Sequence, residues 1–290
     1  MHEIGARVSW EAMEAIAEEL RELGAAGVVV EQEGRNALVK AYLEDDTQVA
    51  DALSRLQDAI DMLPSWDLPI GPGEVWCSRI DPQEWETAWR ALFHPIRLGQ
   101  RLWLCPPWEP AAPSGDEIVV VIDPGMAFGT GEHETTQLCA ELLEATIQGG
   151  ETVADVGTGS GVLAILAARL GAGRVYAIDN DPVAVEAAEA NVVRNGVEEV
   201  VQVREGHFLS GLKGIDVLVA NLNTALLQQM LPQLPEALRP GARMIVSGIG
   251  LANREVARRA LQSSGIELTA EPVRGEWCAF GGVWQGGTEI

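Results

Sequence analysis

The sequence predicts an α/β protein in two parts, a small α+β domain followed by a larger domain built on an open, mostly parallel sheet. From residue 116 onward, strand and helix signals alternate, which is typical of parallel strands joined by crossover helices. Before residue 81, two strand signals follow one another directly, and a stretch rich in tryptophan and proline separates this part from the rest. We therefore expect domains at 1–80 and 116–290, with a helix and linker at 81–115.

The first domain has the expected element order β-α-β-β-α-β. Alternating apolar residues predict its strands, and apolar residues at helical spacing predict its helices. The expected strands are 3–8, 27–31, 37–43 and 74–80, and the expected helices are 10–23 and a second one that Thr47 caps. This is the order of the ferredoxin-like fold, in which two helices cover an antiparallel sheet.

The linker at 81–115 contains four tryptophans and six prolines. A helix at 82–92 followed by a rigid Pro-rich segment would set the angle between the domains, and buried tryptophans need no ligand to explain them. The alternative is a direct binding role. We favour the packed connector.

The second domain repeats strand and helix signals. The expected strands are 118–122, 152–155, 175–179, 200–205, 217–221 and 243–247, and the expected helices are 134–147, 163–170, 182–195, 225–237 and 253–263. Ligands of open parallel sheets bind beyond the carboxyl ends of the strands. Functional residues are therefore expected in the loops that follow the strands.

Charge excludes one class of function. The chain has 43 acidic and 20 basic residues, a net charge of −23 at pH 7. This charge repels phosphate backbones, so a general nucleic-acid binder is not expected. It would attract a basic protein or a cationic substrate, although an acidic surface also serves solubility alone.

Neither a membrane nor an oxidising compartment is indicated. The first seven residues lack the basic start and apolar core of a signal sequence, and no apolar run is long enough to span a bilayer. The four cysteines form no Cys-x-x-Cys pair, which argues against a zinc site or a disulfide framework. We expect a cytoplasmic protein.

A glycine-rich turn, Asp155-Val156-Gly157-Thr158-Gly159-Ser160-Gly161, leads from an expected strand directly into an apolar helix. Such glycines let the backbone turn sharply and lie close against a ligand. In dinucleotide-binding folds the third glycine comes one place later. Asp179 ends the next strand, 22 residues after Gly157, at the distance expected of a carboxylate that binds ribose hydroxyls. Together these features favour a nucleoside ligand.

Two further elements reach the same edge of the sheet. Asn221 ends a strand, and its carboxamide can orient a ligand or an incoming amine without changing charge. The alternative role, capping the next helix, suits Asn223 or Thr224 better. A Gly-rich loop at 123–136 opens another helix, so its amides and hydroxyls are expected to face the same crevice.

These residues resemble a known family. The Asp155–Gly161 turn and Asp179 are typical of class I S-adenosylmethionine-dependent methyltransferases, and within that class the chain is similar to the ribosomal protein L11 methyltransferases. The similar residues are Ala127-Phe128-Gly129-Thr130-Gly131, His133 and the paired threonines after it, Trp85, Trp89, Phe93, Pro95, Pro106-Pro107-Trp108 and Glu276-Trp277. The resemblance covers nearly the whole chain, including the N-terminal domain, which in that family grips the ribosomal protein.

The resemblance implies S-adenosylmethionine as the cofactor and a basic ribosomal protein of the large subunit as the partner. The implied cofactor-binding residues are Thr136, Gly157, Asp179 and Asn221, with Phe128, Gly129, Thr130, Asp155 and Gly159 beside them. Asn221, which would line the acceptor channel, is the catalytic candidate. The family usually has an apolar and a small residue after this asparagine. This chain has Leu222, Asn223 and Thr224, so an extra amide follows the expected acceptor position.

The implied reaction methylates lysine side chains, an N-terminal amine or both. An ammonium has no lone pair, so the acceptor must first lose a proton to solvent or to a base such as His133 or Asp123, although a histidine at a helix start more often has a structural role. Other readings stay open: a related methyltransferase acting on a different protein lysine, a glutamine amide or a small amine, a nonenzymatic binding module, and a nicotinamide-dependent dehydrogenase, which the early third glycine disfavours.

Overall fold

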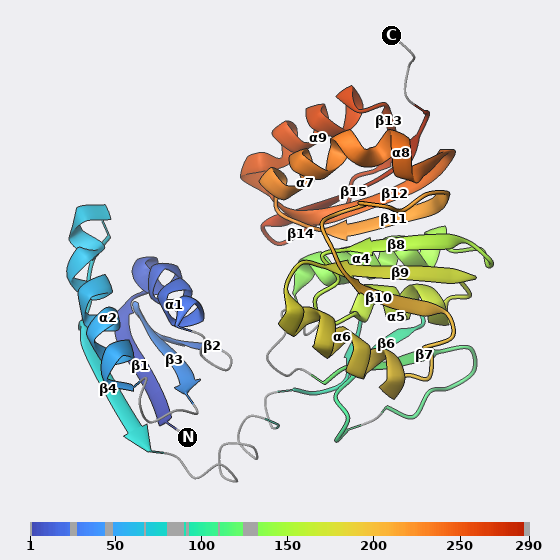
Figure 1. Cartoon of the computed structure of the whole chain (residues 1–290). Coiled ribbons are helices and arrows are strands. Elements are labelled where there is room, and N and C mark those ends of the chain that lie inside the picture. Colours follow the sequence, from blue (N-terminus) through green and yellow to red (C-terminus); the bar gives the residue numbers. More distant parts are fainter. Residues whose placement is uncertain are drawn as a thin grey trace. The chain divides into compact units, whose positions relative to one another are not determined.

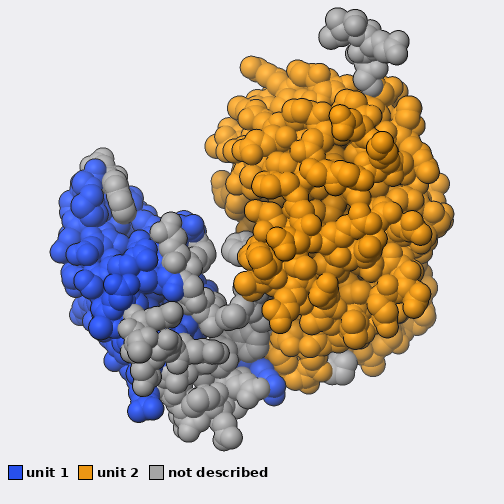
Figure 2. Space-filling view, viewed as in Figure 1, with its two compact units in different colours: residues 1–92 blue, residues 93–290 orange. Residues whose placement is uncertain are grey.

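The computed structural model describes residues 2–23, 28–43, 49–66, 68–79, 90, 93–109, 111–123 and 133–286 (Figure 1). The chain divides into two compact units, residues 1–92 and residues 93–290 (Figure 2). The first unit has one hydrophobic core, and the second has a core on each face of its main sheet.

The first unit is a four-stranded antiparallel sheet in the order β2-β3-β1-β4, covered by two helices. Its elements are β1 (His2–Ser9), a 3-10 turn (Trp10–Ala12), α1 (Met13–Glu22), β2 (Val28–Glu33), β3 (Asn36–Leu43), α2 (Val49–Met62), a second 3-10 turn (Leu63–Trp66) and β4 (Glu74–Arg79). Alternate β1 residues, such as Ile4 and Val8, pack with Leu20 of α1 and Leu56 of α2. The predicted ferredoxin-like order is confirmed. Thr47 lies outside the described residues.

The second unit is built on an eight-stranded, mostly parallel sheet, as predicted. The strand order is β10-β9-β8-β11-β12-β15-β13, with β14 paired to β15, and the first five strands are parallel. Its elements are α4 (Glu134–Thr146), β8 (Thr152–Val156), α5 (Val162–Arg169), β9 (Arg174–Asp179), α6 (Pro182–Arg194), β10 (Val201–Glu205), β11 (Ile215–Asn221), α7 (Thr224–Met230), α8 (Leu234–Ala237), β12 (Leu238–Gly250), α9 (Arg254–Ser263), β13 (Ile266–Ala270), β14 (Val273–Arg274) and β15 (Trp277–Trp284), with 3-10 turns at Leu231–Gln233 and Leu251–Asn253. The antiparallel strands at the C-terminal end were not predicted.

Helices cover both faces of this sheet (Figure 1). Leu143 of α4, Ile165 of α5 and Val192 of α6 share a core with one face. The other face packs against α7, α8 and α9 through Leu227 and Leu261, among others. Because the central strands β8 and β11 are buried on both faces, they are largely apolar, and β9 and β11 end in the polar residues Asp179 and Asn221.

The structure corrects one predicted strand. Residues 118–122 were expected in the main sheet, but β7 (Ile118–Val121) belongs to a separate three-stranded sheet with β5 (Ile96–Arg97) and β6 (Leu102–Cys105). Apolar side chains of this sheet, including Leu104 and Val120, enter the same core as α4 and α5. Much of the expected linker therefore folds with the second unit. Trp85, Trp89 and nearly all of the expected helix at 82–92 lie outside the described residues.

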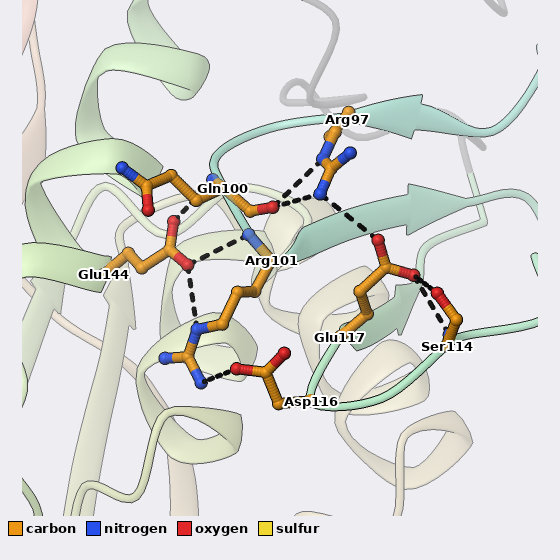
Figure 3. A network of polar contacts seen from close by, with 7 residues as sticks. All are labelled: Arg97, Gln100, Arg101, Ser114, Asp116, Glu117 and Glu144. Atoms are coloured by element: carbon orange, nitrogen blue, oxygen red, sulfur yellow. Dashed lines mark hydrogen bonds and ion pairs between the residues drawn. The ribbon is translucent and has the colours of Figure 1, made fainter.

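A polar network fastens this small sheet to α4 (Figure 3). Glu144 of α4 accepts hydrogen bonds from the backbone N–H groups of Gln100 and Arg101, at 2.8 and 3.0 Å, and from Nε of Arg101 at 3.2 Å. On the same sheet, Arg97 pairs with Glu117 at 3.2 Å. The carboxylate therefore holds the turn before β6 against the last turn of α4.

Candidate active site

The glycine turn follows β8 and has the left-handed backbone that only glycine adopts without strain. The φ angles of Gly157, Gly159 and Gly161 are 70°, 54° and 83°. A Cβ atom at Gly157 would lie 2.6 Å from Cδ2 of Leu222, and one at Gly161 would lie 3.3 Å from Cα of Ala188. The turn is therefore tightly enclosed by neighbouring elements, and its glycines are required by geometry.

Asp155 holds the turn from inside the protein. Its side chain is fully buried, and Oδ2 accepts hydrogen bonds from the Thr158 hydroxyl at 2.6 Å and the Ala164 N–H at 3.0 Å. Oδ1 is buried and has no hydrogen-bond partner among the described residues. Burial raises the pKa of this carboxyl to about 7. The carboxyl group thus links the turn to the first turn of α5.

Asp179 lies at the carboxyl end of β9, next to the glycine turn. Its Oδ2 accepts the Gly159 N–H at 2.9 Å, and its Oδ1 accepts the Asp181 N–H at 3.1 Å. Asp181 in turn caps α6 by accepting the N–H of Val183 at 2.9 Å. The predicted pair of turn and carboxylate is therefore brought together, and each carboxylate oxygen of Asp179 keeps acceptor capacity for a ligand.

Asn221 lies at the carboxyl end of β11 and contacts the start of α4. Its Nδ2 donates to the hydroxyl of Thr135 at 3.1 Å. His133 is the N-cap of α4, and its Nδ1 accepts the N–H of Thr135. Thr135 and Thr136 are both buried, at 4% and 2% exposure, but it is Thr135 that contacts Asn221. The sequence shows two adjacent threonines but does not indicate which of them contacts the asparagine.

The loop after β11 is fixed from two sides. Gly248 of β12 has φ 82°, and a Cβ there would lie 2.6 Å from the carbonyl oxygen of Leu222. The Leu222 N–H donates to the carbonyl of Ser247 at 3.0 Å. Asn223 caps α7, accepting the N–H of Leu226 at 2.9 Å. The side-chain oxygen of the extra amide after Asn221 is thus engaged in helix capping.

The β14–β15 hairpin, which the sequence did not predict, packs against the first turns of α4. Arg274 hydrogen-bonds to Gln137 and pairs with Glu141 at 2.7 Å. The Trp277 ring meets the His133 ring edge-on, with centroids 4.8 Å apart. The hairpin therefore holds the end of the helix that carries His133 and Thr135.

Asn191 of α6 joins the glycine turn to the start of the Gly-rich loop. Its Nδ2 donates to the carbonyl of Ser160 at 2.9 Å, and its Oδ1 accepts the Asp123 N–H at 3.1 Å. The Asp123 carboxylate pairs with Arg194 at 3.2 Å. Of the two candidate bases, His133 thus caps a helix and Asp123 is ion-paired. The predicted residues Phe128, Gly129 and Thr130 lie outside the described residues.

The chemistry of the site is that of a neutral amide, a carboxylate and a partly buried glycine backbone. Within the described ranges, no group of His, Cys, Asp and Glu side chains is arranged to bind a metal ion. Among the same residues, no helix is long and apolar enough to cross a bilayer. The arrangement suits binding and alignment of a polar organic ligand.

Comparison with known proteins identifies similar chains. A family model described as "Ribosomal protein L11 methyltransferase (PrmA)" matches residues 1–284. Ribosomal protein L11 methyltransferases from Bacillus cytotoxicus and Bacillus anthracis are 36% identical over 303 aligned positions, which cover 96% of this chain and 97% of each relative. The crystal structure of ribosomal protein L11 methylase from Lactobacillus delbrueckii subsp. bulgaricus is 33% identical, with a TM-score of 0.63, and covers 67% of this chain and all of that one.

Proposed function

Because the chain belongs to the ribosomal protein L11 methyltransferase family, we propose that it transfers methyl groups from S-adenosylmethionine to amines of ribosomal protein L11. The acceptors would be lysine side chains, the N-terminal amine or both. The observation that carries this proposal is the meeting of the glycine turn, Asp179 and Asn221 at one edge of the sheet. Such an enzyme would act in the cytoplasm, where ribosomal proteins are made.

The residues present fit S-adenosylmethionine. Because Gly157 has no side chain, Leu222 packs directly against it, and the turn offers its backbone groups to a ligand. Asp179 is held by two N–H groups and keeps lone pairs for the two ribose hydroxyls. We assign the methionine part to Gly157 and Gly159, with Phe128, Gly129 and Thr130 contributing from the loop, Thr136 from the first turn of α4, and Asp155 supporting the turn.

Bound S-adenosylmethionine would supply a methyl carbon on a positively charged sulfur. The protein then needs to align an uncharged amine with that carbon and to exclude water. Asn221 is suited to the first task, since its amide hydrogen-bonds without adding charge. Because His133 and Asp123 are occupied by capping and ion pairing, we assign loss of the amine proton to solvent before transfer.

Charge supports a basic protein partner. Residues 1–92 hold 19 acidic and 7 basic side chains, so the N-terminal unit is strongly negative. Such a field accelerates encounter with a positively charged partner, and salt screens it. We propose that this unit recognises the ribosomal protein.

The alternative acceptors are less well supported. The departure from the family pattern that suggested them, Asn223, has its side-chain oxygen engaged with the N–H of Leu226. That oxygen is therefore not available as a second acceptor beside Asn221. L11 itself is therefore the acceptor that we propose.

The proposal is tested by incubating the full-length protein with labelled S-adenosylmethionine and a mixture of large-subunit ribosomal proteins. Label in L11 alone is the expected result. Calorimetric titration of the cofactor into the wild type and Asp179→Ala separates the two halves of the proposal. If Asp179→Ala binds the cofactor as the wild type does, the ribose assignment is wrong. Label in another protein would move the acceptor elsewhere.

A further inference from the structure

Thr135 lies between two polar groups that belong to different elements. Its hydroxyl oxygen is 2.8 Å from Nδ1 of His133, on the N-cap of α4, and 3.1 Å from Nδ2 of Asn221, at the end of β11. The side chain is buried. The hydroxyl therefore bridges the helix start and the strand end.

The direction of these hydrogen bonds follows from the helix cap. Nδ1 of His133 accepts the backbone N–H of Thr135, so this nitrogen carries a lone pair and the ring proton is on Nε2. A proton on Nε2 faces the Glu134 carboxylate, which is 4.0 Å away. Since Nδ1 is an acceptor, the Thr135 hydroxyl must donate its only proton to it.

The hydroxyl oxygen is then left as an acceptor, and only the NH₂ end of the Asn221 carboxamide can pair with it. The carboxamide oxygen, Oδ1, must point to the opposite side. The two ends of an amide have similar size, so without such a partner either orientation would be possible. Asn221 donates to Thr135, and Thr135 donates to His133. These two hydrogen bonds fix the orientation of the carboxamide.

We propose that Thr135 is a positioning residue which turns the Asn221 carboxamide so that its oxygen is presented to the acceptor amine. This inference rests on the proposed function, because it takes Asn221 to face the acceptor. A carboxamide oxygen accepts an N–H of the amine and leaves the nitrogen lone pair available for the methyl carbon. The reversed amide would donate to that lone pair and block attack.

The surroundings make the arrangement rigid. The Trp277 ring packs edge-on against His133, and the carbonyl of Ser247 and the close approach of Gly248 hold Leu222, the residue after Asn221. Both ends of the hydrogen-bond chain are thus fixed by β12 and β15. Within this chain of hydrogen bonds, the Thr135 hydroxyl can be removed by substitution with valine, which changes the side-chain volume little.

The first test compares Thr135→Val with Thr135→Ser in the full-length enzyme. Valine keeps the branched shape and removes the hydroxyl, whereas serine keeps the hydroxyl. We expect kcat with L11 to fall at least tenfold in Thr135→Val, with KM for S-adenosylmethionine within about twofold of wild type, since the loss is one of alignment. Thr135→Ser should retain kcat within about threefold. Thr146→Val, in the last turn of the same helix, is the matched control and should leave kcat unchanged.

Two results would overturn the inference. The first is a wild-type kcat in Thr135→Val. The second is an equal loss of activity in the serine and valine variants, because an equal loss would show that packing at residue 135 matters and the hydroxyl does not. An unfolded Thr135→Val would show no amide dispersion in its NMR spectrum, and Thr135→Ala would then replace it in the comparison with serine.

A second readout does not depend on activity. In ¹⁵N-labelled protein, the Nδ2 group of Asn221 is identified by its absence in Asn221→Ala. Its exchange with solvent should be at least tenfold faster in Thr135→Val than in the wild type and Thr135→Ser. Equal exchange in all three proteins would refute the positioning role. If the wild type methylates no ribosomal protein, the proposed function fails, and this exchange measurement still decides whether Thr135 orients Asn221.

Discussion

Asp155 should make the second unit less stable as the pH rises. Its carboxyl is fully buried beneath the glycine turn, and burial raises its pKa from 3.8 to about 7. Between these two values the folded state holds a proton that the unfolded chain has released. The folded state is therefore favoured by this group below about pH 4, and the advantage is lost as the pH rises to 7.

The size of the effect follows from the pKa difference. One pKa unit corresponds to about 1.4 kcal/mol, so a rise from 3.8 to about 7 amounts to about 4 kcal/mol in full. Roughly 2–3 kcal/mol of this falls between pH 5 and pH 8. Asp155→Asn removes the titrating group and keeps an oxygen for the Thr158 hydroxyl and the Ala164 N–H.

Hydrogen exchange of the β8 and α5 amides measures the opening free energy of this unit alone. We expect the opening free energy of the wild type minus that of Asp155→Asn to fall by roughly 2–3 kcal/mol from pH 5 to pH 8. The background titration of the acidic surface cancels in this difference. A difference that is constant or rises with pH would show that Asp155 is already ionised in the folded protein and would refute the reasoning.

Three further predictions concern the elements around the site. Gly248→Ala should destabilise the second unit by more than about 2 kcal/mol in denaturant unfolding, because the left-handed backbone and the Leu222 carbonyl both oppose a Cβ; an unchanged midpoint would contradict the close approach. Asn191→Asp should raise KM for S-adenosylmethionine about tenfold in steady-state assays, since the lost N–H no longer holds the Ser160 carbonyl while Oδ1 is kept; an effect on kcat alone would count against it. His133→Ala should cost about 1 kcal/mol of stability through the lost cap, and His133→Asn should restore it by thermal unfolding; equal stability of the two variants would show that the cap is dispensable.

Local pattern was enough to predict most elements of both units. Burial alternates along β3, and Ile4 and Val8 of β1 fall on the buried face. The β-α-β-β-α-β order then leaves few ways to close an antiparallel sheet. The glycine turn could be predicted from the sequence because a left-handed backbone requires glycine, and three closely spaced glycines stand directly before an apolar helix. Asp181, with Pro182 after it, marked the start of α6 for a similar reason.

Contacts between segments that are far apart in the chain could not be predicted from the sequence. Strand β7 has the apolar run of a main-sheet strand, and only its parallel pairing with β6 places it in a separate sheet. The side chain that meets Asn221 depends on the rotation of α4 about its axis, which selects Thr135 over Thr136. The close approach of Gly248, in β12, to Leu222, in the loop after β11, joins two segments that are separate in the sequence. Each of these features is set by tertiary packing.

The most direct test of the account is the intact mass of purified L11 after incubation with the full-length wild type and S-adenosylmethionine, followed by peptide mapping of the modified residues. The account predicts mass increases in whole methyl groups located on lysine side chains, on the N-terminal amine or on both. An L11 of unchanged mass, under conditions in which calorimetry shows that the enzyme binds the cofactor, would contradict the claim that this site methylates L11.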